Sequence, residues 1–174
     1  MSKHEIIVYL ENRNQSMGSY HNHKEVCSWG AVSFFAIFSS LINLIKIPEG
    51  QEIISTALLS IVTITALLFA HYYIYVQQKL KDRAGAIYAA SLFFISELIR
   101  DRIAESDFDA FMTIEDSSET YMQSDHCLPK AIRDRADIFN TRGRGAQLRT
   151  RILTYGLLYI VGICLISSKW LQTI

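Results

Sequence analysis

Residues 26–45 read VCSWGAVSFFAIFSSLINLI, twenty consecutive residues without a charged side chain. Residues 53–76, IISTALLSIVTITALLFAHYYIYV, follow after a short loop and also contain no Lys, Arg, Asp or Glu. A third uncharged run covers residues 152–168. A helix needs about twenty apolar residues to cross the roughly 30 Å hydrocarbon core of a bilayer. The pattern therefore predicts an all-α membrane protein with three transmembrane helices. A two-span protein with a peripheral third helix is the alternative.

Lysine and arginine are distributed unevenly around these runs. Of the 17 in the chain, twelve lie in residues 77–151. Because positive charge near the ends of spans is retained in the cytoplasm, this segment is predicted to be cytoplasmic. The predicted organisation is a cytoplasmic amino-terminal segment (1–25), a two-span hairpin (26–76), a cytoplasmic helical domain (77–151), a third transmembrane helix (152–168) and an external tail (169–174).

The segment after the second span reads QQKLKDRAGAIYAASLFFISELIRDRIAES from Gln77 onward. Its apolar residues recur with the 3.6-residue period of a helix, which predicts an amphipathic continuation of the span to about Ala104. The stripe consists of Leu80, Ala84, Ile87, Ser91, Ile95 and Leu98, widened by Tyr88, Leu92 and Ile99. Another segment, another subunit or the membrane surface must bury this face. The mixed charge of its polar face makes the membrane surface the least favoured of the three.

Charge is then sharply polarised along the chain. Residues 105–125 hold seven acidic residues and no Lys or Arg, whereas residues 130–151 hold seven basic residues and two acidic ones. The acidic part is predicted to be a loop or short helices, and the part after Pro129 a helix to about Phe139. The two blocks either neutralise each other or, alternatively, the basic block binds an anionic ligand.

The basic block ends in NTRGRGAQLRTR, residues 140–151, which enters the third uncharged run. Glycine lets a backbone approach an anion, and arginine binds phosphate through two parallel hydrogen bonds. The stretch is therefore predicted to form a phosphate-binding collar for lipid headgroups, a nucleotide signal or an oligonucleotide. The same arginines also set the orientation of the third span, so topology is a second explanation. The predicted anion-binding residues are Lys130, Arg133, Arg135, Arg142, Arg144, Arg149 and Arg151.

Polar residues follow one face of each helix in the predicted hairpin. They either join packed helices by hydrogen bonds or line a water-filled path in an oligomer. The absence of a carboxylate inside any predicted span argues against a proton-coupled transporter. The predicted pore-lining residues are Ser33, Ser40, Asn43, Thr56, Ser60 and Thr63.

The chain offers little for catalysis or metal binding. Its net charge of zero argues against a soluble nucleic-acid-binding protein. The candidate metal ligands are His21, His23, His126 and Cys127, whose spacing does not match a zinc site. No nucleophile elbow, zinc-protease motif or phosphate loop occurs in the sequence. We therefore expect a non-enzyme without a metal or cofactor.

The hairpin, followed by QQKLKDRAGAIYAASLFFISELIRDR, resembles the SLATT-type membrane effectors of prokaryotic antiphage defence over about residues 26–104. The third span and the short amino-terminal region depart from the simplest pattern. The resemblance implies a homo-oligomeric pore in the bilayer of the bacterial inner membrane. A nucleotide or oligonucleotide would control it, with a nucleotidyltransferase or another soluble defence protein as partner. The alternatives are a non-conducting scaffold or sensor that recruits a soluble partner through residues 105–125, and a holin-like toxin.

Overall fold

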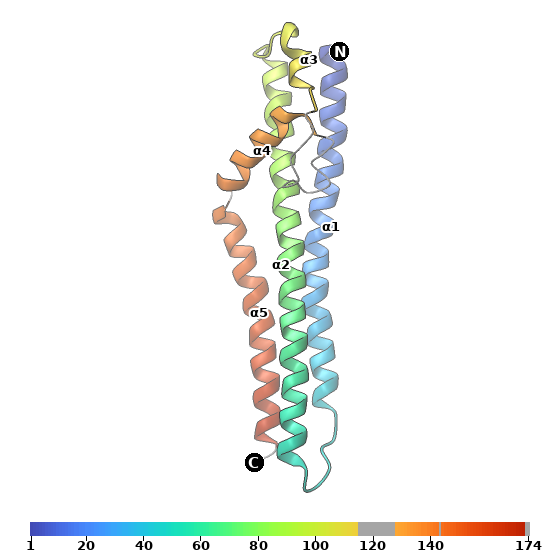
Figure 1. Ribbon diagram of the computed structural model, residues 1–174, viewed down its shortest axis with the longest axis vertical. Helices are drawn as coiled ribbons and strands as arrows, with labels where there is room; N and C mark the ends of the chain where they lie inside the picture. The colour runs from blue at the N-terminus through green and yellow to red at the C-terminus, as the bar shows by residue number, and fades with distance from the viewer. Residues whose placement is uncertain (115–127, 143, 173–174) are drawn as a thin grey trace. The chain divides into compact units, whose positions relative to one another are not determined.

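The computed structural model describes residues 1–114, 128–142 and 144–172, without the side chains of residues 142–147. No strand occurs in these ranges, which agrees with the predicted all-α class (Figure 1). The elements are α1 (Lys3–Asn43), α2 (Glu52–Ile99), η1 (Glu105–Asp107), α3 (Phe108–Phe111), α4 (Lys130–Arg142) and α5 (Arg144–Leu171).

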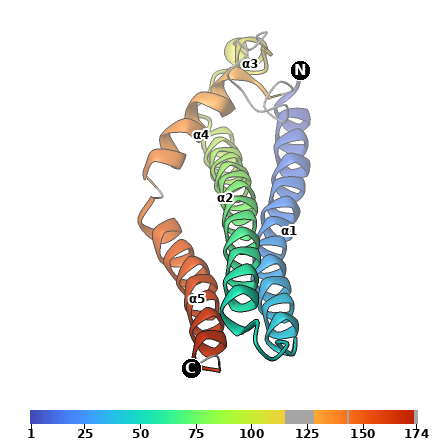
Figure 2. The same ribbon diagram turned by 60° about the horizontal axis from the view of Figure 1, so that its bottom comes forward.

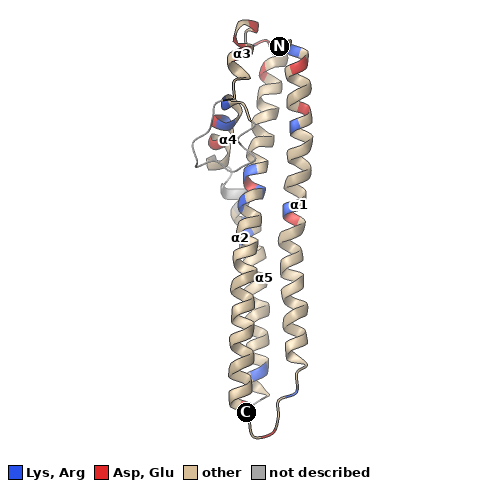
Figure 3. Cartoon of the chain, turned by 45° about the vertical axis from the view of Figure 1, so that its right-hand side comes forward, with Lys and Arg blue, Asp and Glu red and all other residues tan. Residues whose placement is uncertain are grey.

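The chain forms two compact units, and α1 and α2 each contribute residues to both. Unit 1 consists of Met1–His23 and Leu80–Gly145, and unit 2 of Lys24–Lys79 and Ala146–Ile174. Figure 3 shows that acidic and basic residues gather along the elements of unit 1, whereas long stretches of α1, α2 and α5 carry none.

Unit 2 is built from three helical segments that run side by side (Figure 2). α1, α2 and the part of α5 from Leu148 to Leu171 are each long and apolar enough to cross a membrane. This confirms the three predicted spans and identifies the chain as a multi-pass membrane protein by the length and composition of its helices. The core of the unit consists of Val32, Phe35, Leu67, Ile74 and Leu158.

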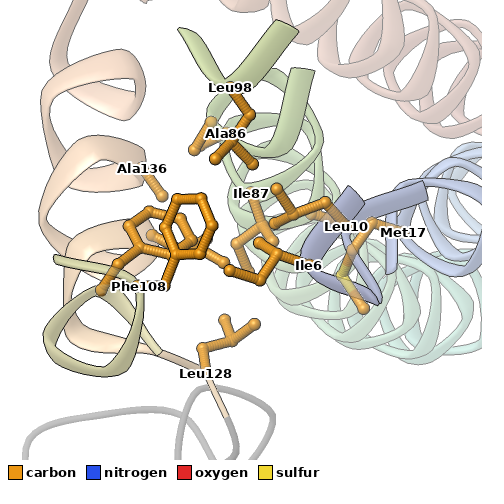
Figure 4. Close-up of a cluster of buried hydrophobic side chains, with 13 residues drawn as sticks. Ile6, Leu10, Met17, Ala86, Ile87, Leu98, Phe108, Leu128 and Ala136 are labelled. Atoms are coloured by element: carbon orange, nitrogen blue, oxygen red, sulfur yellow. The ribbon is translucent and has the colours of Figure 1, made fainter. Parts of the chain in front are cut away.

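Unit 1 has its own hydrophobic core, to which the amino-terminal segment contributes. Figure 4 shows Ile6, Leu10 and Met17 of α1 in one cluster with Ile87 of α2 and with side chains of α3 and α4. The predicted amphipathic helix therefore buries its apolar stripe against other segments of the same chain. The remaining buried members are Ala84, Ala86, Ala90, Leu98, Phe108, Phe111, Leu128, Ile132 and Ala136.

The buried stripe of α2 differs on one side from the predicted one. Tyr88, Leu92 and Ile99, which were expected to widen it, are exposed. Ala86 and Ala90 are buried in their place. The widening of the stripe by Tyr88, Leu92 and Ile99 was therefore wrong, because the face that packs against the rest of unit 1 extends to the side of Ala86 and Ala90 instead.

α2 ends at Ile99, five residues before the predicted end near Ala104. The backbone N–H of Asp101 bonds to the carbonyl of Leu98, and the N–H of Arg102 bonds to the carbonyl of Glu97. These are the two hydrogen bonds of a Schellman motif, which terminates a helix through a residue in the left-handed conformation. Asp101 is that residue, with φ of 52°. Because this residue is aspartate and not glycine, the sequence gave no indication that the helix ends here.

The polypeptide from α4 into α5 is helical on both sides of Gly143. α4 continues to Arg142, three residues beyond its predicted end at Phe139, and α5 begins at Arg144. Residues 144–151 of the predicted collar form the first turns of α5, and its anion-binding role stays a prediction.

Candidate anion-binding and polar sites

Arg135 of α4, one of the predicted anion ligands, stacks on two aromatic rings. Its guanidinium carbon lies 3.8 Å from the centre of the Phe93 ring and 5.2 Å from that of Phe139. A cation over an aromatic face is attracted by the ring's negative potential, which fixes the plane of the guanidinium. Within the described residues the Arg135 side chain makes no hydrogen bond and no ion pair. Its hydrogen-bonding capacity toward a phosphate is therefore not taken up by a carboxylate in those ranges.

Of two other arginines in unit 1, one is buried and the other forms an ion pair. The Arg133 side chain is buried, with 3% of the residue exposed, so a ligand reaches it only if unit 1 opens. Arg83 of α2, which the sequence did not single out, forms an ion pair of 2.5 Å with Asp137 of α4. This pair joins α2 to α4 and accounts for one of the two acidic residues in the basic block. The part of the neutralisation hypothesis that concerns residues 115–125 falls outside the described residues.

The predicted anion ligands are divided between the two units. Lys130 is exposed on unit 1, whereas Arg149 is exposed and Arg151 half-buried on unit 2. The side chains of Arg142 and Arg144 lie outside the described part. No single unit therefore carries the complete predicted set, and the anion-binding role of these residues stays a prediction.

The polar seam of α1 is exposed in the single chain, apart from its last member. Ser33 and Ser40 are exposed, and the Ser40 hydroxyl donates to the Ala36 carbonyl at 2.8 Å. Asn43 is half-buried and exchanges two hydrogen bonds with Ser168 of α5, at 2.9 and 3.2 Å. The seam thus divides into an outward-facing pair of serines and an asparagine that links two helices.

The polar seam of α2 is turned toward the interior of unit 2. Thr56 and Thr63 are buried, and Ser60 is half-buried. The hydroxyls of Ser60 and Thr63 each donate to a carbonyl four residues earlier in the same helix, both at 2.8 Å. This arrangement satisfies buried hydroxyls without water. A pore lined by these side chains would require the three spans to repack, so that role stays a prediction.

Contacts between distant helices were not predictable from the sequence. The Tyr159 hydroxyl lies 3.0 Å from Nδ1 of His71, and the Tyr155 ring lies 4.6 Å from the His71 ring. Lys169 of α5 is 4% exposed, and its ammonium donates to the Ile45 carbonyl at 2.9 Å. The partners in these contacts are 84 to 124 positions apart, and no periodic signal links positions so distant.

Metal binding has no support in the described ranges, where no three His, Cys, Asp or Glu side chains come together. His126 and Cys127 lie outside them. Comparison of the chain with protein-family models, with curated proteins and with solved structures finds no match.

Proposed function

We propose that this chain is an oligomeric effector of the bacterial inner membrane that gates an ion path in response to an anionic nucleotide or oligonucleotide. In this proposal unit 1 is cytoplasmic and senses the ligand, whereas unit 2 spans the bilayer. The antiphage role rests on the resemblance to SLATT-type effectors, with a nucleotidyltransferase or another soluble defence protein as the source of the signal.

The observation that carries the proposal is the continuity of α1 and α2. α1 supplies Ile6 and Leu10 to the core of unit 1 and Val32 and Phe35 to the core of unit 2. α2 likewise contributes to both cores without a break in the helix. A helix transmits rotation and translation along its axis because its backbone hydrogen bonds resist local deformation. A change in the packing of unit 1 would therefore reach the spans through two helices at once.

Arg135 is the proposed contact for the ligand phosphate. Its guanidinium is oriented by Phe93 and Phe139, so less side-chain entropy is lost when it binds an anion. α4 also holds Asp137, whose ion pair with Arg83 fixes the helix to α2. Ligand binding shifts an equilibrium only if the two states bind it with different affinity. A ligand that draws α4 away from α2 would provide this difference, because it would act against the Arg83–Asp137 pair.

The proposed conduction path uses the exposed serines of α1. Ser33 and Ser40 are seven residues apart and therefore share one helix face. Hydroxyl groups that face lipid do not favour insertion into the bilayer. Between subunits, hydroxyl groups can replace part of an ion's hydration shell. The proposal therefore places this face of α1 toward neighbouring copies of the chain.

Ion flux from liposomes containing the purified protein tests the proposal. Short oligonucleotides and cyclic nucleotides are added separately, and flux is expected to respond to one of them. Arg135→Gln should raise the concentration that gives a half-maximal response by about tenfold, since a charge-assisted hydrogen bond contributes about 1.5–3 kcal/mol. Arg102→Gln is the matched control, because Arg102 is also a base of unit 1 but pairs with Glu97 at 3.1 Å.

A second pair of variants tests the conduction path. Ser40→Leu should lower the flux, whereas Ser167→Leu, at an exposed serine of α5, should not. Absence of flux under every condition, with the protein folded and inserted, would contradict the pore and favour the scaffold. Flux that is independent of every added anion would instead indicate a toxin-like pore without a ligand.

A further inference from the structure

A polar hollow of about 380 Å³ lies in unit 2, where α1 ends, α2 begins and α5 ends. This volume is within the range of small-molecule sites. Two lysines, one glutamate and two amides contribute to its wall, namely Lys46, Lys169, Glu52, Asn43 and Gln172. Asn43 was predicted to line a pore. The other residues of this wall belong to no predicted site and play no part in the proposed gating mechanism.

Lys169 is the fixed cation of the hollow. Burial of an ammonium is costly unless hydrogen-bond partners compensate, and Lys169 donates to the Ile45 carbonyl at 2.9 Å. The neighbouring residue Ser168 is joined to Asn43 by two hydrogen bonds, which fixes this turn of α5 to the end of α1. Lys46 adds a second positive charge and is exposed. Two ammonium groups at one wall favour an anionic group of the ligand.

Glu52 is the fixed anion of the same hollow. One of its carboxylate oxygens accepts a hydrogen bond from the backbone N–H of Gly50 at 2.8 Å. Backbone hydrogen bonds from its own N–H and from Gly50 lower the pKa of the Glu52 carboxyl below its ordinary value, so it is ionised at neutral pH. Among the described residues the wall therefore holds the exposed ammonium of Lys46, the buried ammonium of Lys169 and the carboxylate of Glu52.

The position of the hollow along the helices matches the headgroup layer of a bilayer. The uncharged runs of the first and third spans end at Ile45 and Ser168, next to its lysines. Trp170 follows immediately, and tryptophan is enriched where the hydrocarbon meets the headgroups. A phospholipid headgroup is thus present at this level whenever the protein is in a membrane.

We propose that this hollow binds the headgroup of phosphatidylethanolamine, with its phosphate toward the exposed Lys46 and its ammonium toward Glu52. The zwitterionic headgroup matches both signs of charge in the wall. Phosphatidylglycerol supplies the phosphate but leaves the Glu52 carboxylate without a cation. Phosphatidylcholine supplies both charges, but its trimethylated nitrogen has no N–H to donate to a carboxylate. The hollow therefore selects phosphatidylethanolamine over both.

Native mass spectrometry of the full-length protein, delipidated in detergent and titrated with each lipid separately, tests this proposal. Wild-type protein is expected to bind one phosphatidylethanolamine per chain about tenfold more tightly than either other lipid, the effect of one charge-assisted hydrogen bond. Glu52→Gln should invert the preference toward phosphatidylglycerol, since the carboxylate that receives the ethanolamine ammonium is then lost while the Lys46 ammonium remains. Equal affinity of the wild type for the three lipids would overturn the proposal, as would an unchanged preference in Glu52→Gln.

The lysines provide the second arm of the experiment. Lys46→Gln should weaken the binding of all three lipids, and because Lys46 is exposed the substitution leaves the core of unit 2 unchanged. Lys79→Gln, an exposed lysine at the opposite end of the second span, is the matched control and should leave binding unchanged. Equal losses in Lys46→Gln and Lys79→Gln would show non-specific charge attraction and would also overturn the proposal. Both arms of the experiment measure lipid binding, so their results do not depend on whether the protein conducts ions.

Discussion

At the scale of single residues, Asp101 shows how one side chain determines where a long helix stops. Its φ of 52° lies in the left-handed region, which costs a residue other than glycine about 1–2 kcal/mol. Aspartate tolerates this conformation better than most residues because its short side chain can bond locally. Asp101 also pairs with Lys3 at 2.5 Å, so it joins the end of α2 to the start of α1.

Substitution of Asp101 separates the backbone effect from the charge effect. Asp101→Ala is expected to lower the free energy of unfolding of unit 1 by about 1–2 kcal/mol, because alanine retains a Cβ and has no local hydrogen bond. Asp101→Gly should be close to neutral, since relief of the backbone offsets loss of the ion pair. Thermal unfolding in detergent measures both, and Lys3→Gln reports the ion pair alone. Equal stability of the alanine and glycine variants would contradict the role of the left-handed conformation.

The start of α1 provides a pH-dependent prediction. The Ser2 N–H donates to the Glu5 carboxylate at 2.7 Å, and the Glu5 N–H donates to the Ser2 hydroxyl at 3.3 Å, which is a capping box. The backbone N–H of Ser2, followed by its hydroxyl, lowers the pKa of Glu5 below the ordinary value of 4.5. The folded-state pKa is therefore the lower one. The stabilisation is present above the unfolded pKa and is lost as the pH falls through the folded pKa.

Carbon-13 NMR of the Glu5 carboxyl group measures this directly. The titration midpoint in the wild type should lie below 4.5, and Ser2→Ala should move it upward by removing the hydroxyl contribution. Identical midpoints for Glu5 in the wild type and in Ser2→Ala would show that the hydroxyl contributes nothing.

At the scale of elements, apolar periodicity predicted the helices well but predicted their contacts only in part. The period along α2 placed Ala84, Ile87 and Leu98 correctly on the buried face. The same pattern could not show that Arg133 of α4 is buried, because a run of basic residues carries no information about which members face a core. Nor could it show that α4 bonds to α2 through Arg83 and Asp137, since local sequence does not encode a contact 54 residues apart.

Gly162 of α5 lies in close contact with side chains of α1 and α2 within unit 2. A Cβ at this position would lie 3.3 Å from Cδ2 of Leu67 and 3.7 Å from Cζ of Phe35, whereas a Cβ at Gly156 would meet nothing within 4 Å. Gly162→Ala is therefore expected to lower the free energy of unfolding by about 1–3 kcal/mol through overpacking. Gly156→Ala should be neutral or slightly stabilising because alanine favours the helix. Thermal unfolding in detergent that ranks the two variants the other way would contradict this packing.

At the scale of the whole molecule, the uncharged runs sufficed to predict three spans, because bilayer thickness imposes a length that few other structures require. The amino-terminal segment was predicted only as a separate cytoplasmic piece. Its Ile6, Leu10 and Met17 recur at helical spacing, which is the signal that would have found its buried face. The sequence pattern could not identify the segment that covers this face, because the part of α2 in unit 1 follows only after a complete hairpin.

The participation of α1 in unit 1 can be tested by paired substitution. Ile6→Ser with Leu10→Ser places two hydroxyls at fully buried positions and is expected to cost at least about 4 kcal/mol. Unit 1 should then unfold while the spans remain inserted, so trypsin should cut α2 after Lys81 and Arg83. Val8→Ser is the control, since Val8 is exposed on the same helix. Protection of α2 from trypsin in the double variant would contradict the proposed core.

The division of unit 1 between the two ends of the hairpin has a consequence for biosynthesis. Its first part, Met1–His23, leaves the ribosome well before its second part, Leu80–Gly145, has been translated. At roughly 5–20 residues per second, Ile6 and Leu10 wait on the order of 5–25 seconds for their partners. During that interval two spans must insert while an apolar helix face stays uncovered. A nascent chain of this protein is therefore expected to need a holding chaperone, or a membrane insertase, near its amino terminus before its own core can close.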